Sequence, residues 1–419
     1  MNAIFLDRDG TIIEDPYKGG DFDKVEFLPG AIEAVKQLSE RFLVIVVTNQ
    51  PAVAKEMCTE EQIQNSNKRM VDLLKEAGVR VDAVYYCPHH PETLYTQNKY
   101  RTDCNCRKPK TGMLEEAAKK FNLELKKCWM IGDTTIDIEA GKRAGCKTIL
   151  VRTGEAGKDG KFVVSPDFTA DNLLQASDIV RKNTITQAVI LAGGRGERLK
   201  PLTDTLPKPM LPIAGKPLLE WQLLSLKKHG INNVVICASY LAEKIKNYFG
   251  HEWNGIKISY PEEAQLLGTG GAIRNSSDIL DDNFLVINGD VVNLIDFSSL
   301  TDFHMSKKCL ATVVVRHSDH PKDSDIVDAD KNGRIVSFVG RGQDDKKLGI
   351  TGIFIINKEL IKKIPDGFST LEKDVIVNCL NDSVFAYISN DYIKDMGTFE
   401  RYEKVKVDFP AKLVKIGFV

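Results

Sequence analysis

Residues 3–11 read AIFLDRDGT, a short apolar run that ends abruptly in two aspartates and a glycine. The apolar part has the character of a buried strand, so Asp7 and Asp9 would emerge at the carboxyl end of that strand. Open α/β sheets bind their ligands at that edge. Two carboxylates in this place can divide the work of phosphate removal, because one can attack phosphorus while the other donates a proton to the leaving oxygen.

Short β-branched runs alternate with helical patterns after this stretch, which is typical of a parallel sheet with helices on both faces. Strands are predicted at 43–47, 84–86, 128–131 and 147–151, and helices near 30–40, 60–77, 112–121, 136–144 and 171–181. Two of the strands end in polar residues, TNQ at 48–50 and GDTTID at 132–137. Since phosphate and an attacking carboxylate are both negative, we expect a Mg²⁺ ion between these loops.

Two cysteine-containing stretches follow, CPHHP at 87–91 and CNCRKPK at 104–110. Three cysteines and one histidine in two tight pairs have the composition of a closed structural zinc site. The candidate ligands are Cys87, His89, Cys104 and Cys106. His90 is an alternative to His89, and free thiols beside a surface histidine are the alternative without metal. A metal here would pin a polar loop and would hold Arg107 and Lys108 at the mouth of the site.

These motifs together resemble the haloacid-dehalogenase superfamily over roughly residues 1–165, in particular its capless branch of heptose-bisphosphate and histidinol phosphatases. The resemblance implies an open site with Asp7 as the nucleophile and Asp9 as the general acid/base. It also implies roles for neighbouring residues: phosphoryl binding by Thr48 and Lys108, substrate contacts by Asn49, Gln50 and Arg107, and Mg²⁺ ligation by Asp7, the Asp9 carbonyl and Asp133. The sequence PAVA at 51–54 departs from the Ser-Gly pair that these relatives usually carry.

A second phosphate-handling pattern begins at residues 187–199, which read QAVILAGGRGERL. A glycine-rich turn after a buried strand exposes backbone N–H groups to phosphate oxygens. The turn lacks the Lys-Ser/Thr of a P-loop and the third glycine of a dinucleotide fingerprint. Arg198 could neutralise a departing pyrophosphate, Lys208 could bridge two phosphates, and Asp290, at the end of an apolar run, could hold Mg²⁺. A glycine-rich surface loop without a ligand is the alternative.

The second half resembles the nucleoside-diphosphate-sugar pyrophosphorylases over about residues 187–410. The resemblance implies that the triphosphate is held by Gly193, Gly194, Arg198 and Lys208, that Gly268 lies beside the nucleoside, that Glu372 and Lys373 bind the sugar and its phosphate, and that Asp290 and Asp395 ligate Mg²⁺. Thr351-Gly352-Ile353 stands where relatives usually show Asn-Ala-Gly. An in-line attack on the α-phosphorus needs no protein nucleophile.

The bulk composition fits two α/β domains. The 419 residues are 42% hydrophobic and 27% charged, with a net charge of −1, so we expect neither a nucleic-acid partner nor a membrane span. No secretory signal is visible, and nine cysteines with three clustered suit a reducing cytoplasm. We expect two Rossmann-like domains: a capless haloacid-dehalogenase-type domain with a zinc loop at 1–182, and a nucleotide-diphospho-sugar transferase domain of the GT-A type at 187–419. A homo-oligomer is compatible with the sequence.

The combination is most similar to the fused heptose enzymes, which join a D-glycero-α-D-manno-heptose 1,7-bisphosphate 7-phosphatase to the 1-phosphate guanylyltransferase. The resemblance implies sugar phosphates and GTP as substrates, Mg²⁺ at both sites and zinc in the first domain. Three alternatives remain: a histidinol-phosphate-type phosphatase fused to a mannose- or hexose-1-phosphate transferase, a sugar-nucleotide sensor without turnover, and an assembly scaffold. The complete sets of charged residues favour an enzyme.

Overall fold

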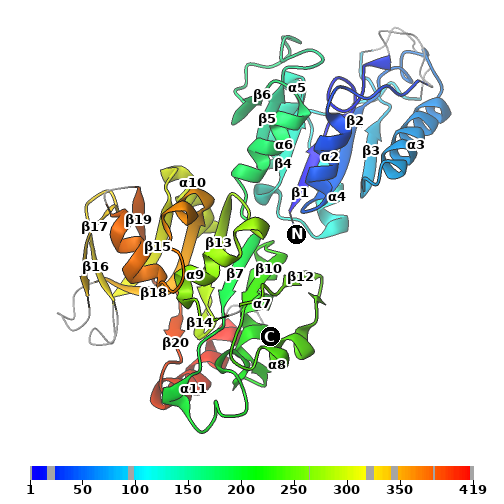
Figure 1. The fold of residues 1–419 in the computed structure, drawn as a ribbon. Coiled ribbons are helices and arrows are strands. Elements are labelled where there is room, and N and C mark those ends of the chain that lie inside the picture. The colour runs from blue at the N-terminus through cyan, green and yellow to red at the C-terminus, as the bar shows by residue number, and fades with distance from the viewer. Residues whose placement is uncertain are drawn as a thin grey trace. The chain divides into compact units, whose positions relative to one another are not determined.

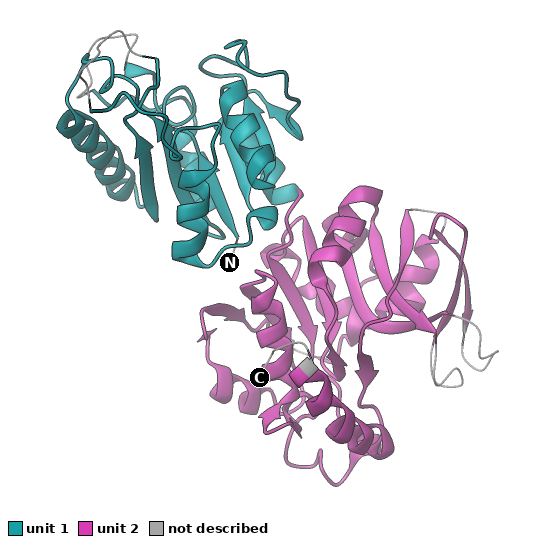
Figure 2. Ribbon diagram, turned by 180° about the vertical axis from the view of Figure 1, so that it is seen from behind, with its two compact units in different colours: residues 1–182 teal, residues 183–419 magenta. Residues whose placement is uncertain are grey.

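The computed structural model describes residues 2–16, 24–92, 99–263, 265–317, 325–340, 348–380 and 383–415. The chain divides into two compact units, residues 1–182 and 183–419, drawn in teal and magenta in Figure 2. Each unit has its own sheet and its own hydrophobic cores.

The first unit is built on a six-stranded sheet in which every pair of neighbouring strands is parallel. Its strands are β1 (Ala3–Leu6), β2 (Leu43–Asn49), β3 (Ala83–Cys87), β4 (Trp129–Gly132), β5 (Lys147–Val151) and β6 (Phe168–Ala170). Their order, β3-β2-β1-β4-β5-β6, places β1 beside β4 (Figure 1). The direction of winding reverses between these two strands, and such a switch point opens a crevice at the carboxyl edge of a sheet.

Helices cover both faces of this sheet, because its strands are apolar on both sides. They are α2 (Ala31–Ser39), α3 (Glu60–Glu76), α4 (Gly112–Phe121), α5 (Thr135–Ala144) and α6 (Leu173–Lys182), with a 3-10 turn at Leu125–Lys127. α2, α3 and α6 pack against the face that carries Ile4 and Leu6, whereas α4 and α5 pack against the face of Ala3 and Phe5. The parallel sheet and the helices expected from the sequence are thus confirmed within a few residues.

The second unit contains a mixed ten-stranded sheet, with the central order β11-β12-β10-β7-β13-β18-β15-β19. Those strands are β7 (Gln187–Leu191), β10 (Asn233–Cys237), β11 (Glu252–Trp253), β12 (Ile256–Ser259), β13 (Asn283–Asn288), β15 (Ala311–His317), β18 (Leu348–Asn357) and β19 (Val384–Ile388). β16 (Ile326–Ala329) and β17 (Ile335–Gly340) extend it, and two small pairs join β8 (Pro212–Ile213) to β9 (Lys216–Pro217) and β14 (Val291–Asn293) to β20 (Ile393–Asp395). β7 is parallel to both β10 and β13, so this half again has a carboxyl edge formed by several strands.

The helices of the second unit are α7 (Leu218–Lys228), α8 (Ala242–Phe249), α9 (Gly268–Asn275), α10 (Phe297–Lys307) and α11 (Phe399–Lys415). Short turns lie at Glu197–Leu199, Lys208–Met210, Ser277–Ile279, Lys358–Lys363, Leu371–Ile376 and Val377–Cys379. α11 closes a core of its own, in which Trp221 and Phe409 meet edge to face with ring centroids 5.6 Å apart. Leu199 is buried in the same core, so the last helix supports the loop that carries Arg198.

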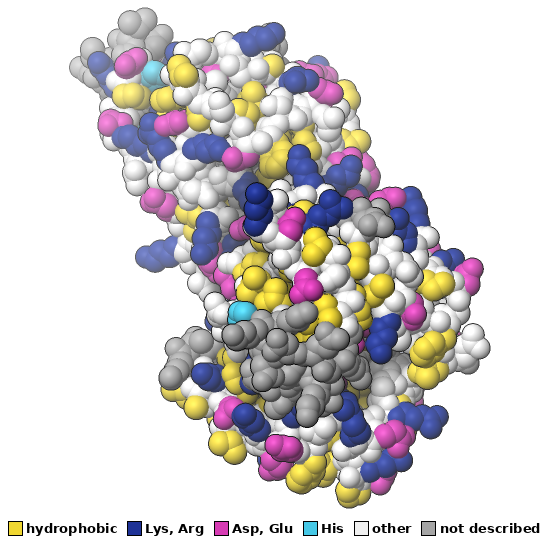
Figure 3. Space-filling model, turned by 90° about the vertical axis from the view of Figure 1, so that its left-hand side faces the viewer, with side chains coloured by type: hydrophobic (Ala, Val, Ile, Leu, Met, Phe, Trp, Pro, Cys, Tyr) yellow, Lys and Arg dark blue, Asp and Glu magenta, His cyan; other side chains and the backbone are white. Residues whose placement is uncertain are grey.

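The described surface shows no concentration of one charge sign on the face drawn in Figure 3, where basic and acidic side chains are interspersed. Within the described ranges, no helix has both the length and the apolar character that crossing a bilayer requires.

Candidate active sites

Polar side chains gather at the carboxyl edge of the first sheet, where the strand order reverses. Asp7 directly follows β1, and its backbone N–H donates to the Ile131 carbonyl of β4 at 2.9 Å. A cavity of about 220 Å³ opens here. Seven of the residues expected from the sequence line it: Asp7, Asp9, Thr48, Asn49, Arg107, Lys108 and Asp133.

Lys108 is the central cation of this cavity and is only 2% exposed. Its Nζ donates to Asp7 Oδ1 at 2.6 Å, to Asp137 Oδ1 at 2.6 Å and to the Val47 carbonyl at 2.7 Å. Although burial opposes its charge, Asp137 and Asp7 raise the pKa of Lys108 above its usual value. The ammonium therefore stays charged at neutral pH and contacts both carboxylates.

Three buried carboxylates, those of Asp7, Asp133 and Asp137, have oxygens within 4.8 Å of one another. Burial raises the pKa of Asp7 to about 7, with Asp137 and Asp9 adding to the rise and Lys108 opposing it. Burial, followed by Asp7 and Asp137, raises the pKa of Asp133 to about 8. One lysine thus does not balance the negative charge, and a divalent cation with oxygen ligands fits the deficit.

Two glycines let the backbone approach Asp133 closely. Gly10 and Gly154 have φ of +77° and +56°, and a Cβ on Gly154 would lie 2.1 Å from Asp133 Oδ2. That same carboxylate oxygen accepts the Glu155 N–H at 2.7 Å. Any other residue at position 154 would displace Asp133 from the cavity.

Asp9 is held from behind by Arg8, to which no sequence motif assigned a role, and by Gln50, which was expected to contact the substrate. Arg8 donates to both Asp9 carboxylate oxygens, and Gln50 Nε2 donates to Asp9 Oδ2 at 2.7 Å. Arg8 also donates to Asn67 Oδ1 at 2.7 Å. Asp137 was likewise quoted only as part of a motif, yet it pairs with Lys108 and also caps α5, where Thr134 N–H donates to its Oδ2 at 3.1 Å.

The expected substrate contacts of the TNQ stretch are engaged within the protein. The Asn49 side-chain amide exchanges two 3.0 Å hydrogen bonds with the backbone of Lys108. Gln50 is fully buried and also donates to Thr48 Oγ1 at 3.0 Å. In this arrangement Asn49 fixes Lys108 and Gln50 fixes Asp9.

The four candidate zinc ligands form one cluster. The Cys104 Sγ atom lies 3.4 Å from that of Cys87 and 3.1 Å from that of Cys106, and His89 Nδ1 lies 3.4 Å from Cys106 Sγ. These separations exceed a disulfide bond and are close to the ~3.8 Å edges of a tetrahedron with zinc–sulfur bonds of about 2.3 Å. His90 lies outside the cluster and accepts the Glu92 N–H at 3.1 Å.

The cysteine cluster and the phosphoryl site share one segment of chain. Cys106 is followed directly by Arg107 and Lys108, and Arg107 donates to the His89 carbonyl at 3.0 Å. Tyr100 of the same loop donates to Glu60 of α3 at 2.6 Å. The loop geometry therefore determines where Lys108 and Arg107 stand.

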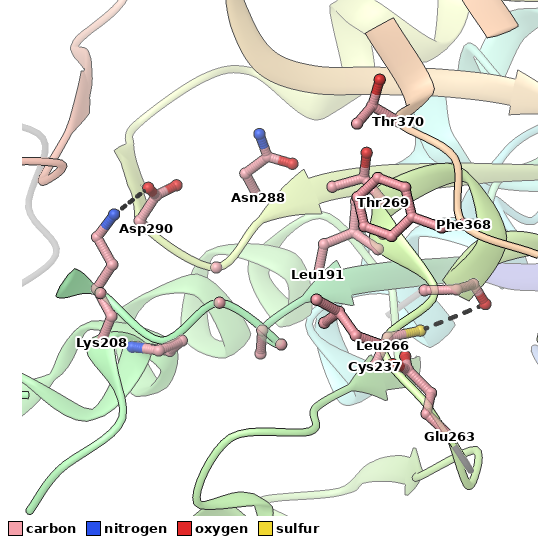
Figure 4. Close-up of a pocket in the computed structure, with 18 residues that line it drawn as sticks. Leu191, Lys208, Cys237, Glu263, Leu266, Thr269, Asn288, Asp290, Phe368 and Thr370 are labelled. Atoms are coloured by element: carbon pink, nitrogen blue, oxygen red, sulfur yellow. Dashed lines mark hydrogen bonds and ion pairs between the residues drawn. The ribbon is translucent and has the colours of Figure 1, made fainter. Parts of the chain in front are cut away.

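The second unit has a cavity of about 360 Å³ at the carboxyl ends of β7, β10 and β13. At one end of it, Lys208 and Asp290 form an ion pair (Figure 4). Gly193 and Gly194, in the loop that follows β7, line the cavity. A Cβ on Gly193 would lie 2.9 Å from Ser239 Oγ, which donates to the Gly193 carbonyl at 3.0 Å. The loop thus presents backbone rather than side chains.

The other end of this cavity is apolar, with one carboxylate. Leu266 and Phe368 project into it although they are 64% and 62% exposed. Glu263 and Cys237 lie at the same end (Figure 4), and burial raises the pKa of both groups. Apolar side chains beside a few polar groups are typical of the walls of ligand pockets.

A segment around residues 367–371 is fastened onto the start of α9. Gly268 has φ of +72°, and a Cβ there would lie 2.4 Å from the Ser369 carbonyl. That carbonyl accepts the Gly270 N–H at 2.9 Å, and the Leu371 N–H donates to Thr269 Oγ1 at 2.7 Å. This contact was not predicted from the sequence, because Leu371 and Thr269 of the glycine motif are 102 positions apart.

Four of the expected residues, Arg198, Glu372, Lys373 and Asp395, are not among the described residues that line the cavity. The β14–β20 pair nevertheless brings Asp395 opposite Val291, and the Met396 N–H donates to the Asp290 carbonyl at 2.9 Å.

The carboxylate of Asp395 accepts two bonds from Arg401, at 2.9 and 3.1 Å. Although burial opposes it, the Gly397 N–H and Arg401 lower the pKa of Asp395. A Cβ on Gly397 would lie 3.0 Å from the Arg198 guanidinium, so Arg198 and Asp395 flank the same turn. Glu372 is half-buried, and burial raises its pKa.

The nucleotidyl transferase family model matches residues 187–411, which is more than half of the chain. The chain belongs to the nucleotidyl transferase family. A HAD-hydrolase-like family model matches residues 105–176, within the first unit. This nucleotidyl transferase is therefore joined to a hydrolase on one chain, and it is a bifunctional enzyme.

Three curated relatives illustrate the two halves. The chain is 43% identical over 162 residues to the D-glycero-beta-D-manno-heptose-1,7-bisphosphate 7-phosphatase of Pasteurella multocida, covering 38% of this chain and 86% of that protein. It is 37% identical over 218 residues to the D-glycero-alpha-D-manno-heptose 1-phosphate guanylyltransferase of Campylobacter jejuni, covering 52% and 96%. It is 34% identical over 228 residues to the mannose-1-phosphate guanylyltransferase of Mycobacterium tuberculosis, covering 53% of this chain and only 64% of that protein.

Proposed function

We propose that the first unit removes the 7-phosphate of D-glycero-α-D-manno-heptose 1,7-bisphosphate and that the second transfers GMP from GTP to the resulting heptose 1-phosphate. The products are phosphate, pyrophosphate and GDP-heptose. The observation that carries the proposal is the pair of separate charged cavities on one chain, around Lys108 and around Lys208. The relatives from P. multocida and C. jejuni support it, since one is named as a heptose 1,7-bisphosphate 7-phosphatase and the other as a heptose 1-phosphate guanylyltransferase.

In the phosphatase reaction, Asp7 attacks phosphorus while the bond to the sugar oxygen breaks, and Asp9 donates a proton to that oxygen. Water then attacks the aspartyl-phosphate, the bond between Asp7 and phosphorus breaks, and Asp9 takes the proton back. Lys108 and Thr48 would hold the phosphoryl oxygens, and Arg107 would contact the far end of the sugar. The contacts of Lys108 with Asp7 support this assignment, because they place the ammonium beside the nucleophile.

Two metals belong to the proposal for this unit. Asp7, the Asp9 carbonyl and Asp133 would hold Mg²⁺, which neutralises charge between the carboxylates and the incoming phosphate. Cys87, His89, Cys104 and Cys106 would hold Zn²⁺ in a closed tetrahedral site, supported by their mutual contacts. The zinc site would have a structural role, fixing the segment that carries Lys108.

In the transferase reaction, Gly193, Gly194, Arg198 and Lys208 would hold the triphosphate, and Glu372 and Lys373 would bind the sugar phosphate. Asp290 and Asp395 would ligate Mg²⁺, which offsets the charge of the phosphates. The position of Lys208 beside Asp290 supports its placement between the two reacting phosphates. Catalysis then consists of aligning the sugar phosphate with the α-phosphorus and stabilising the departing pyrophosphate.

Guanine is the proposed base because of Glu263. The apolar end of the cavity suits a purine ring between Leu266 and Phe368, and a carboxylate accepts two parallel N–H bonds from the N1 and N2 positions of guanine. Adenine has an acceptor at N1 and would face the carboxylate unfavourably. Gly268, at the start of α9, would lie beside the nucleoside.

The α-anomer is proposed although the phosphatase relatives are named for the β-anomer. The first reaction occurs at carbon 7, at the far end of the sugar from the anomeric centre. The second reaction uses the anomeric phosphate itself, and the guanylyltransferase relatives are named for the α-anomer. The transferase should therefore decide which anomer reaches the product.

A second candidate function is a mannose- or hexose-1-phosphate guanylyltransferase, favoured by the likeness to the M. tuberculosis protein. We propose residues 1–182 and 187–419 as the two functional domains, small sugar phosphates and GTP as the only ligands besides metals, and a cytoplasmic location.

A set of parallel incubations tests these proposals. The protein is supplied with Mg²⁺, with the α- or β-anomer of heptose 1,7-bisphosphate or with mannose 1-phosphate, and with each of the four nucleoside triphosphates, and the products are read by mass spectrometry. We expect GDP-heptose from the α-anomer and GTP. Faster formation of GDP-mannose, or a better yield with UTP or ATP, would contradict the assignment.

A further inference from the structure

Arg8 lies between the two aspartates of the first motif, and its side chain is fully buried. Its Nε donates to Asp9 Oδ1 at 2.7 Å, and one terminal nitrogen donates to Asp9 Oδ2 at 3.0 Å. The other terminal nitrogen donates to Asn67 Oδ1 on α3 at 2.7 Å. A planar guanidinium that is fixed at both ends has one orientation available.

Gln50 completes the surroundings of Asp9. It is also fully buried, and its Nε2 donates to Asp9 Oδ2 at 2.7 Å and to Thr48 Oγ1 at 3.0 Å. An ionised carboxylate has about four acceptor positions, and three of those on Asp9 are taken by Arg8 and Gln50. The fourth acceptor position of Asp9 is on the side that faces the cavity, since Asp9 lines it.

Arg8 itself does not line that cavity among its described residues. Its guanidinium therefore stands behind Asp9 rather than in the cavity, and the cation that contacts Asp7 and Asp137 is Lys108 instead. Burying an arginine is costly unless each of its bonds is well made. The arrangement favours a residue that orients Asp9 over one that binds substrate.

We propose that Arg8 is a positioning residue for the acid/base. Anchored by Asn67 and assisted by Gln50, it holds the Asp9 side chain so that one carboxylate oxygen faces the leaving oxygen and then the attacking water. The proposal rests on the proposed phosphatase reaction. It does not depend on which sugar phosphate is the natural substrate.

The two half-reactions separate this role from a purely structural one. An alkyl phosphate needs a proton from Asp9 when its oxygen leaves, whereas the p-nitrophenolate of p-nitrophenyl phosphate leaves without one. Water attack on the aspartyl-phosphate needs Asp9 as a base for either substrate. If Asp9 is no longer held in place, the first release of p-nitrophenol should therefore keep its rate. Only the later turnovers, which wait for hydrolysis of the aspartyl-phosphate, should be slower.

The test uses the full chain with Arg8→Lys, which keeps the charge and loses the two-pronged contact, and Asn67→Ala, which removes only the anchor. Arg80→Lys is the matched control, because Arg80 donates to the Ser39 and Phe42 carbonyls elsewhere in the same unit. Release of p-nitrophenol is followed by rapid mixing, and turnover is measured on p-nitrophenyl phosphate and on a primary sugar phosphate.

We expect Arg8→Lys to release about one equivalent of p-nitrophenol per site at the wild-type rate. Its steady state and its turnover of the sugar phosphate should then be at least tenfold slower. Asn67→Ala should show the same pattern more weakly, and Arg80→Lys should behave as wild type. Equal slowing of the burst and of sugar-phosphate turnover, or no change in either, would overturn the proposal. Turnover of p-nitrophenyl phosphate without any turnover of heptose bisphosphate would instead count against the proposed substrate alone.

Discussion

The two cavities handle phosphate with opposite means. In the first, charged side chains are buried, and burial raises the pKa of Asp7 to about 7 and that of Asp133 to about 8. In the second, glycines and apolar side chains form most of the wall, and the Lys208–Asp290 pair is only partly buried.

The difference follows from the two reactions that we propose. A covalent route through an aspartyl-phosphate needs a desolvated nucleophile held against a cation, so its residues are locked together by short contacts. A direct nucleotidyl transfer needs two substrates aligned, so backbone donors and a shaped surface suffice. The first site should be sensitive to the loss of any charge, and the second should be sensitive to the identity of the ligand.

The largest expected effect is the separation of the two activities. Asp7→Asn should lower phosphate release by about a thousandfold or more, some 4 kcal/mol of barrier, and should leave pyrophosphate release from heptose 1-phosphate and GTP unchanged. Asp290→Ala should do the reverse. Separate phosphate and pyrophosphate assays on each folded variant check this, and loss of both activities in either variant would remove the distinction between the sites.

Loss of the buried cation should destabilise the first unit. Lys108→Met leaves Asp7 and Asp137 without their common partner, which we expect to cost about 3–5 kcal/mol of unfolding free energy. Lys110→Met is the control, since Lys110 pairs with an exposed aspartate at the surface and should cost less than about 1 kcal/mol. Urea unfolding of the two proteins compares them, and equal midpoints would mean that Lys108 is not the centre of the site.

The cysteine cluster should matter to one activity only. Cys104→Ser should lower the bound zinc from about one ion per chain to a small fraction and slow the phosphatase about tenfold, because the segment carrying Lys108 loosens. Nucleotidyl transfer should change less than twofold. Cys58→Ser, a half-buried thiol outside the cluster, is the control. Full phosphatase activity in zinc-free protein would contradict a structural metal.

The selectivity of the second site for guanine should fall when one carboxylate oxygen of Glu263 is replaced by an amide nitrogen. Glu263→Gln should lower the preference for GTP over ITP, which lacks the N2 amino group, by about tenfold, or 1.4 kcal/mol. The exposed neighbour Glu262 gives the matched control, Glu262→Gln. Ratios of kcat/KM for the two nucleotides measure the effect, and an unchanged ratio would place guanine recognition elsewhere.

The smallest effect is a difference in pH dependence. Asp7 and Asp133 have folded pKa values above the unfolded value of 3.8, so the Mg²⁺-free first unit should lose stability as the pH rises from 4 towards 8. Burial lowers the pKa of His304 in the second unit from 6.5 to about 4. The unfolded chain therefore takes up that proton first, and the second unit should lose about 1 kcal/mol between pH 6.5 and 5.5.

Tryptophan fluorescence separates the two pH effects, because Trp129 reports on the first unit and Trp221 and Trp253 on the second. Trp129→Phe leaves only the second signal. His304→Gln should flatten the pH dependence of the second unit. If the stability of both units changed in the same direction with pH, the buried carboxylates of the first unit and His304 of the second would not differ as described.

The sequence predicted the parts of the sites that lie in short motifs. Asp7 and Asp133 line one cavity and Gly193, Gly194 and Asp290 line the other, as strand ends and the glycine turn suggested. Such residues are predictable because the edge of a parallel sheet gathers the loops of successive strands. The composition of the cysteine cluster was predictable for a similar reason, since its two tight pairs are visible in the chain.

The supporting contacts could not be predicted, because they join residues brought together only by packing. Arg8 meets Asn67 across 59 positions, and Leu371 meets Thr269 across 102. Asn49 looked like a substrate contact, but its amide is engaged by the Lys108 backbone. No local pattern distinguishes a polar side chain that faces a ligand from one that fixes its neighbour.

The most direct test of two sites acting in order is a phosphorus NMR time course on wild-type protein with α-heptose 1,7-bisphosphate, GTP, Mg²⁺ and pyrophosphatase. The proposed reactions predict that the carbon 7 phosphate signal disappears first, that heptose 1-phosphate rises and falls, and that the diphosphate signals of GDP-heptose then grow while the anomeric phosphorus is retained. Loss of the anomeric phosphate first, or a GDP-sugar that still carries the 7-phosphate, would contradict the order and the division of labour between the two units.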